Sequence, residues 1–146
     1  MENVVLRVDG IRFPGTSEEE TVEFVTEGKM YEKGGSLFLV YEESELSGFE
    51  GCTTTLRIAG EKVSMIRFGR DSMMNVRMDF EEGRPYEGYY GTPYGAIEFG
   101  IETNRIISKV SLEDGGYLSI DYDMKLVGLS EGRNLLSIRV LKRGEK

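Results

Sequence analysis

Apolar and polar residues alternate with a period of two along most of the chain. In the first such segment, 4–9, Val4, Leu6 and Val8 share one face, and Arg7 and Asp9 share the other. A period of two is produced by a β-strand with one buried face. The same alternation predicts strands over 21–26, 51–59, 62–68 and 74–81. The segment 36–41, SLFLVY, is apolar on both faces and is predicted to be a central strand.

A tyrosine-rich stretch, YEGYYGTPYGAIEF, occupies residues 86–99. Its glycines permit unusual backbone angles, and its proline fixes one φ angle, so we expect 90–95 to be a shaped connection between strands. Gly95 is expected to have a positive φ. Beyond it Ile97, Phe99 and Ile101 point one way, which predicts a half-buried strand.

The last third of the chain continues the pattern. We expect a turn at Thr103-Asn104, a strand over 105–112, a hairpin turn at 113–116 (EDGG), and strands over 118–124 and 136–140 separated by a turn at 129–133. The chain therefore predicts about ten strands with little helix. We expect one all-β domain over residues 1–146, an antiparallel meander closed into a barrel, because closure hides the edge strands. A two-sheet sandwich is the alternative.

Charge and cysteine content narrow the class of protein. Lys and Arg number 18 and Asp and Glu 26, so the net charge is 18 − 26 = −8. A chain with this net negative charge repels the phosphate backbone of nucleic acids, so we expect no nucleic-acid partner. The only cysteine, Cys52, is expected on an inward face and excludes a disulfide scaffold. The N-terminus, MENVVLRVDG, lacks the long apolar run of a signal peptide or membrane anchor, so we expect a cytoplasmic protein with no membrane partner.

The absence of histidine is the strongest chemical constraint, since it excludes Ser-His and Cys-His catalysis and histidine-ligated zinc. Asp121 and Asp123 share one strand face and could bind a hard cation or act as an acid/base pair, but a solvent-facing strand surface explains them more simply. We therefore expect no enzyme, no cofactor and no metal site.

Two classes of function remain. Methionines at 65, 74, 78 and 124 lean inward and could line a barrel that binds a small apolar molecule, although they could equally fill the core. Such a site needs a polar anchor, and the candidate ligand-binding residues are Arg67, Arg77, Tyr89, Tyr90 and Tyr94. Strand alternation places Arg77 outside unless a bulge intervenes, and the tyrosines could instead pack one end of the barrel.

The alternative function is a non-enzymatic interaction or structural module, either a homo-oligomer or an acidic partner of another protein. Residues 1–50 hold twelve acids and four bases, and an acidic surface would steer a basic partner. A solvated acidic face requires no partner, however.

The blocks LVYEES, GYYGTPYG and SIDYDM, with the alternating strand after the second, give the chain a resemblance to the DUF1934 family over nearly its whole length. The block at 92–95, Thr-Pro-Tyr-Gly, is the most specific of these features. The resemblance implies a fold similar to the calycins, the barrels that include lipocalins and fatty-acid-binding proteins. It implies no activity, so it assigns no residue a catalytic role.

Overall fold

Ten strands make up the regular structure of the computed structural model, which describes residues 1–43, 51–69, 75–92 and 95–142. No helix occurs within these ranges, so none of the described segments is a helix that could cross a membrane. The strands are β1 (Glu2–Arg12), β2 (Glu20–Lys33), β3 (Ser36–Glu42), β4 (Thr53–Ala59), β5 (Lys62–Phe68), β6 (Val76–Glu81), β7 (Tyr86–Thr92), β8 (Gly95–Ser111), β9 (Gly115–Leu126) and β10 (Ser130–Lys142).

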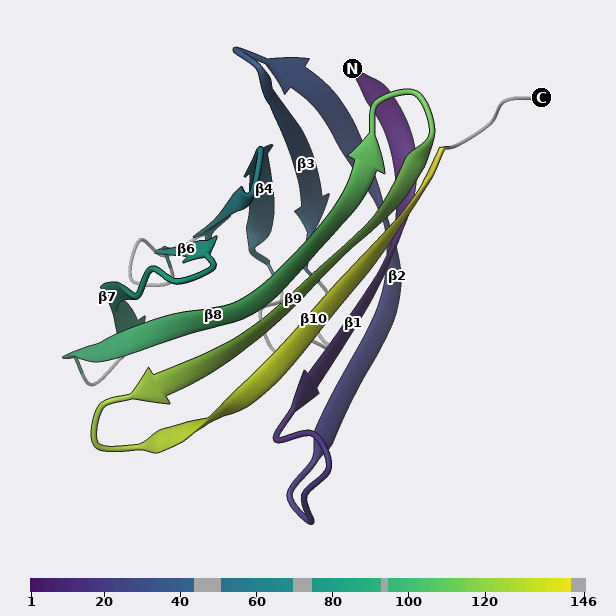
Figure 1. Ribbon diagram of the computed structural model, residues 1–146. Helices are drawn as coiled ribbons and strands as arrows, with labels where there is room; N and C mark the ends of the chain where they lie inside the picture. The colour runs from purple at the N-terminus through teal and green to yellow at the C-terminus, as the bar shows by residue number, and fades with distance from the viewer. Residues whose placement is uncertain (44–50, 70–74, 93–94, 143–146) are drawn as a thin grey trace.

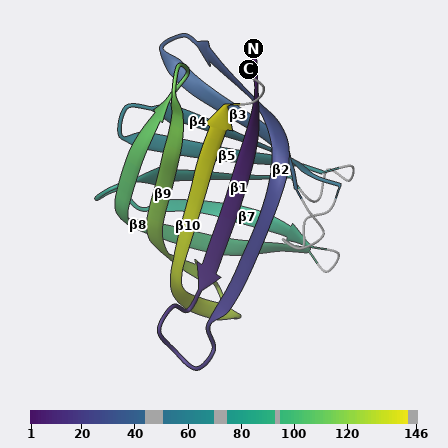
Figure 2. The same cartoon turned by 90° about the vertical axis from the view of Figure 1, so that its right-hand side faces the viewer.

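All ten strands form one antiparallel sheet in the order β6-β5-β4-β3-β2-β1-β10-β9-β8-β7. The pairing of β1 with β10 joins the two halves of the meander, and the sheet curls into a nearly closed barrel (Figure 1). Five strands, β8, β9, β10, β1 and β2, run side by side, and β3, β4, β5 and β7 pass behind them at a steep angle (Figure 2). The predicted all-β barrel is confirmed, and the two-sheet sandwich is not found.

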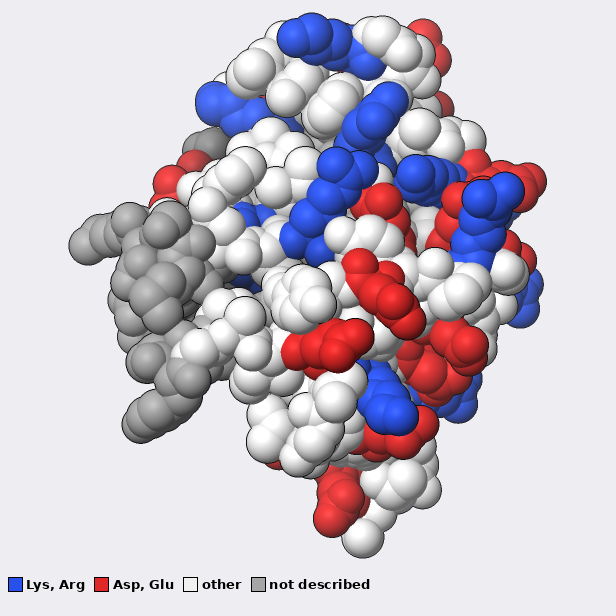
Figure 3. Space-filling view, turned by 90° about the vertical axis from the view of Figure 1, so that its left-hand side faces the viewer, with Lys and Arg blue, Asp and Glu red and all other residues white. Residues whose placement is uncertain are grey.

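The barrel is left without a strand ladder between β6 and β7. A side chain connects the two edges at this point: the backbone N–H of Ile106 in β8 donates a hydrogen bond to Glu82 Oε2, just after β6, at 2.8 Å. An isolated bridge joins Glu82 to Thr103 at the same place. Figure 3 shows this side of the molecule, where basic and acidic side chains lie next to one another.

The inward faces of the strands are those that alternation predicts. Val4, Leu6 and Val8 are buried, as are Phe99 and Ile101. Cys52 is buried as well, in agreement with its predicted inward position. Every strand but one contributes fully buried or nearly buried apolar side chains to a single described core, and β7 adds the partly buried Tyr86. Burial of this kind is the main stabilising term of the fold.

The tyrosine-rich stretch corrects one expectation. The connection expected over 90–95 does not begin at 90, because residues 90–92 belong to the strand β7, which pairs with β8 from Tyr86 opposite Ile101 to Thr92 opposite Gly95. Residues 93 and 94 of that stretch lie outside the described part of the chain. Gly88 fits this strand because it faces the ring of Phe99, where a Cβ atom would come within 2.9 Å of the ring. Glycine therefore marks close packing here rather than a turn. Gly95 has a φ of +116°, as expected.

Two predicted turns are also wrong. Thr103-Asn104 is not a turn but an irregularity within the 17-residue β8, where the register with β9 shifts between Thr103 and Arg105. A β-bulge uses the same polar residues as a turn and lets the strand continue. The turn expected at 129–133 lies earlier, at 127–129 around Gly128, and β10 has already begun at Ser130.

Candidate functional site

A cavity of about 560 Å³ opens inside the barrel. Its wall comes from the inward faces of β1, β2, β3, β5, β6, β9 and β10, together with residues next to those strands. Most of the lining is apolar: Val8, Ile11, Phe13, Val22, Phe24, Met65, Met78, Met124, Leu126, Leu135 and Leu136. The volume lies within the range of about 300–1,000 Å³ that is typical of small-molecule sites.

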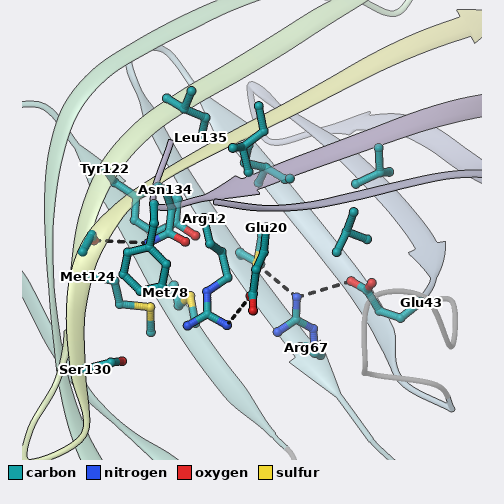
Figure 4. Close-up of a pocket in the computed structure, with 18 of the residues that line it drawn as sticks. Arg12, Glu20, Glu43, Arg67, Met78, Tyr122, Met124, Ser130, Asn134 and Leu135 are labelled. Atoms are coloured by element: carbon teal, nitrogen blue, oxygen red, sulfur yellow. Dashed lines mark hydrogen bonds and ion pairs between the residues drawn. The ribbon is translucent and has the colours of Figure 1, made fainter. Parts of the chain in front are cut away.

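A buried ion pair forms one polar part of this wall. Arg67 Nη2 lies 3.3 Å from Glu43 Oε2, and the two side chains are only 9% and 3% exposed (Figure 4). The Thr54 hydroxyl donates to the same carboxylate oxygen, and Arg67 Nε donates to Thr54 Oγ1 at 3.4 Å. The guanidinium group also contacts Met65 Sδ at 3.7 Å. These partners compensate the two charges for their removal from water.

Tyr41 lies beside this ion pair, and its environment keeps the phenol protonated. Burial raises the pKa of Tyr41 far above its usual value, and the Glu43 carboxylate raises it further, while Arg67 acts in the opposite direction. The phenol is therefore a neutral hydrogen-bonding group at physiological pH and not a base.

A second ion pair lies on the solvent side of the cavity. Arg12 Nη1 and Glu20 Oε1 are 3.6 Å apart, and both side chains are more than half exposed. The Arg12 guanidinium also lies over the ring of Phe13, 5.4 Å from its centroid. The ring itself rests on Gly132, where a Cβ atom would come within 2.2 Å of it. An aromatic ring and an ion pair thus border the cavity where it meets solvent.

Polar side chains also form a row across five neighbouring strands. Pairing places Arg12 of β1 opposite both Glu20 of β2 and Asn134 of β10, Asn134 opposite Tyr122 of β9, and Tyr122 opposite Thr103 of β8. We call these five residues the polar row, and four of them, all except Thr103, line the cavity. Figure 4 shows Tyr122 and Asn134 close together at this wall.

Tyr122 lies in the polar row between Asn134 and Thr103. Burial raises the pKa of its phenol, and the positive charges of Arg67 and Arg12 partly oppose that rise. Both guanidinium groups are therefore within electrostatic reach of the phenol, which stays protonated at neutral pH. Its ring packs edge-on against Phe80, with centroids 4.9 Å apart.

Of the candidate residues named from sequence, Arg67 is the one found in the cavity wall. Arg77 points outward, is 53% exposed and pairs with Asp79, as strand alternation indicated. Tyr89 is 68% exposed on β7 and does not line the cavity. Tyr94 and the side chain of Tyr90 lie outside the described part of the chain, as does Met74. Three of the expected methionines, Met65, Met78 and Met124, do line the cavity.

Sequence reasoning did not name Glu43, Arg12, Tyr122 or Asn134 as candidate site residues. Counting by two from the buried positions finds all four: Arg12 continues Val4, Leu6 and Val8, Glu43 follows Tyr41, Tyr122 follows Leu118 and Ile120, and Asn134 lies four residues before Ile138. That signal was overlooked because charged residues at strand ends are usually solvated.

Asp121 and Asp123 lie on β9 with their carboxylates bound to other side chains. Arg133 donates to both oxygens of Asp121, at 3.0 and 2.7 Å, and the amide of Asn104 donates to both aspartates. Across the described residues, no three Asp, Glu, Cys or His side chains are placed to hold a metal ion. The pair is therefore part of an outer network and not of the cavity.

This network predicts a pH-dependent stability. The hydrogen bond from Arg133 holds the pKa of Asp121 below its usual value. The stabilisation is then present above about pH 4, where the unfolded carboxyl ionises, and is lost as the pH falls through the folded-state pKa. We expect Asp121→Asn to lower the free energy of unfolding in urea at pH 7 and to have a progressively smaller effect as the pH falls below about 4. Asp114→Asn, in the exposed β8–β9 turn, is the control, and equal losses for both variants at pH 7 would contradict the prediction.

Comparison with known proteins adds a family and a related fold. A family model described as "Domain of unknown function (DUF1934)" matches residues 8–138. The crystal structure of the ywiB protein from Bacillus subtilis is similar, with a TM-score of 0.82 and 24% sequence identity over 98% of this chain and 93% of that one. At this level of identity the likeness shows a shared fold. Comparison with curated proteins gave no match.

Proposed function

The chain belongs to the DUF1934 family, whose description assigns no activity, and we propose from the cavity alone that this protein binds a small, largely apolar molecule inside its barrel. The observation that carries the proposal is the 560 Å³ space within a wall of aliphatic, aromatic and methionine side chains. A few polar groups interrupt that wall, as is usual in sites that orient a ligand.

An open pocket of this size costs the fold core contacts that a barrel packed with side chains would have. Protein interiors are packed as densely as organic crystals, and each cavity forfeits contacts that larger side chains would supply. A barrel that served only as a scaffold would be more stable with its interior filled. The open space therefore favours a binding role over a purely structural one.

The methionines suit such a role. Met65, Met78 and Met124 are on three different strands, β5, β6 and β9, and all line the cavity. Methionine side chains are flexible and polarisable, so they adapt to the shape of an apolar guest. We therefore expect the site to accept several related apolar molecules and not only one of a fixed shape.

The test is a titration with N-phenyl-1-naphthylamine, a neutral apolar dye that fluoresces when it leaves water. We expect saturable binding to the wild type. Met124→Trp places a large ring in the cavity and should weaken binding by about tenfold or more. Val25→Trp adds the same ring on the outside, where Val25 is 67% exposed, and should bind as the wild type does.

Melting curves of both tryptophan variants would confirm that each is folded. The proposal fails if the wild type shows no saturable binding. It fails equally if Met124→Trp binds the dye as tightly as Val25→Trp, because the dye would then lie outside the cavity.

A further inference from the structure

The polar row lies next to an apolar level on the same five strands. At the next inward-facing level these strands pair through Val22, Gly10, Leu136, Ile120 and Ile106, none of which has a polar side chain. The polar row is therefore a distinct band on this part of the wall, separate from the ion pair of Arg67 and Glu43. Its position along the cavity fixes where a polar group of a bound molecule would find partners.

From this band we propose that the ligand is an uncharged, largely apolar molecule with one hydrogen-bonding group, a carbonyl, amide or hydroxyl, that lies against Tyr122 and Asn134. The inference rests on the proposed function and specifies the chemistry of its ligand. Three sets of observations support it.

The first is the balance of charge in the wall. Arg67 is paired with Glu43 and Arg12 with Glu20, so among the described residues of the wall the two cations and two anions cancel. An anionic ligand would bring its charge into a low-dielectric space in which both arginines already have an anionic partner. Burying such a charge is costly, whereas a neutral group loses far less hydration.

The second is the unused hydrogen-bonding capacity of the row. Thr103 is 7% exposed, and its buried hydroxyl oxygen has no hydrogen-bond partner among the residues that the structure describes. A buried hydroxyl without a partner is unusual, and Thr103 pairs across the strands with Tyr122, which does line the cavity. The Tyr122 hydroxyl can both donate and accept a hydrogen bond there.

The third is the match between the groups offered and the group proposed. Tyr122 is a neutral phenol that can both donate and accept, and the Asn134 amide has an NH₂ and a carbonyl oxygen. The NH₂ is engaged only at 3.4 Å, by the Gly132 carbonyl on its own strand. A carbonyl, amide or hydroxyl group complements this pair without requiring a charge on either side.

The experiment compares three probes that share one ring system: naphthalene, 2-naphthamide and 2-naphthoate. Ligand-observed NMR titrations at pH 7.5 give a dissociation constant for each. We expect 2-naphthamide to bind about tenfold more tightly than 2-naphthoate. Asn134→Leu and Tyr122→Phe should each weaken 2-naphthamide by about threefold to tenfold and change naphthalene by less than about twofold.

Asn3→Leu is the matched control, since it makes the same chemical change on the exposed outer side of β1 and should leave all three constants unchanged. The use of two cavity variants keeps the test valid if one of them fails to fold, which melting curves would reveal.

Each other result overturns the inference in a recognisable way. If 2-naphthoate binds as tightly as 2-naphthamide, the neutral-ligand inference fails while binding in the barrel stands. If the three probes bind equally and neither variant changes the dissociation constant of 2-naphthamide, water meets the hydrogen-bonding needs of the polar row, and the row does not select a ligand group. If neither these probes nor the naphthylamine dye binds, the proposed function itself fails.

Discussion

Gly116→Ala is expected to be one of the two most damaging single substitutions that the structure indicates. Gly116 lies at the start of β9 with a φ of +127°, and a Cβ atom there would come within 1.8 Å of the Lys109 carbonyl oxygen in β8. That atom is backbone, so only a separation of β8 from β9 could relieve the clash. Backbone strain of about 1–3 kcal/mol and overpacking of about 1–3 kcal/mol together predict a loss of roughly 2–6 kcal/mol.

Gly95→Ala separates the two causes of this loss. Gly95 has a φ of +116°, but a Cβ atom there would meet nothing within 4 Å. We therefore expect strain alone, about 1–3 kcal/mol. Free energies of unfolding from urea titrations would measure both. Equal losses at the two positions would show that β8 and β9 accommodate the added methyl group and that the close approach at Gly116 is unimportant.

The sequence predicts this fold well because alternation acts locally. A residue such as Leu6 or Ile120 is buried because its neighbours at i±1 are on the opposite face, and that parity can be read without knowing the partner strand. The barrel then follows from ten strands and from the absence, in the part of the chain that the structure describes, of a helix that could cover an edge.

Local patterns failed where one residue type serves two purposes. Gly91 suggested a connection over 90–95, but it lies within β7, where a second glycine, Gly88, makes room for the Phe99 ring. Thr103 and Asn104 suggested a turn, but a bulge uses them to shift register within β8. Composition alone cannot separate these cases, because the same backbone freedom serves both.

The candidate site was less predictable than the fold, for a different reason. Arg67 could be named from its place beside Met65, but its partner Glu43 is 24 residues away, and the two meet only when β3, β4 and β5 are in register. The polar row likewise depends on four separate strand registers. The cavity itself is volume that side chains leave unfilled, which no pattern along one strand records.

Arg67→Met is expected to be the other highly damaging substitution, because it would leave the Glu43 carboxylate buried without its cation. The Glu43 side chain is 3% exposed, and the hydroxyl of Thr54 also donates a hydrogen bond to its carboxylate. Removing one partner of a buried ion pair typically costs about 3–5 kcal/mol, a large share of the roughly 5–15 kcal/mol that stabilises an ordinary domain.

Arg77→Met is the matched control, since the same change on the outer face of β6 removes an exposed pair with Asp79. Exposed pairs contribute about 0–1 kcal/mol, so the two arginines should differ by several-fold in their effect on urea unfolding. Adding Glu43→Gln to Arg67→Met should restore most of the lost stability, because a neutral pair of similar volume is often as stable as a buried ion pair. If the double variant is as unstable as Arg67→Met, the loss comes from packing around the arginine stem and not from an orphaned charge. The pairing of Arg67 with Glu43 would then contribute little to stability, and the inference of a neutral ligand, which uses this pairing, would lose part of its support.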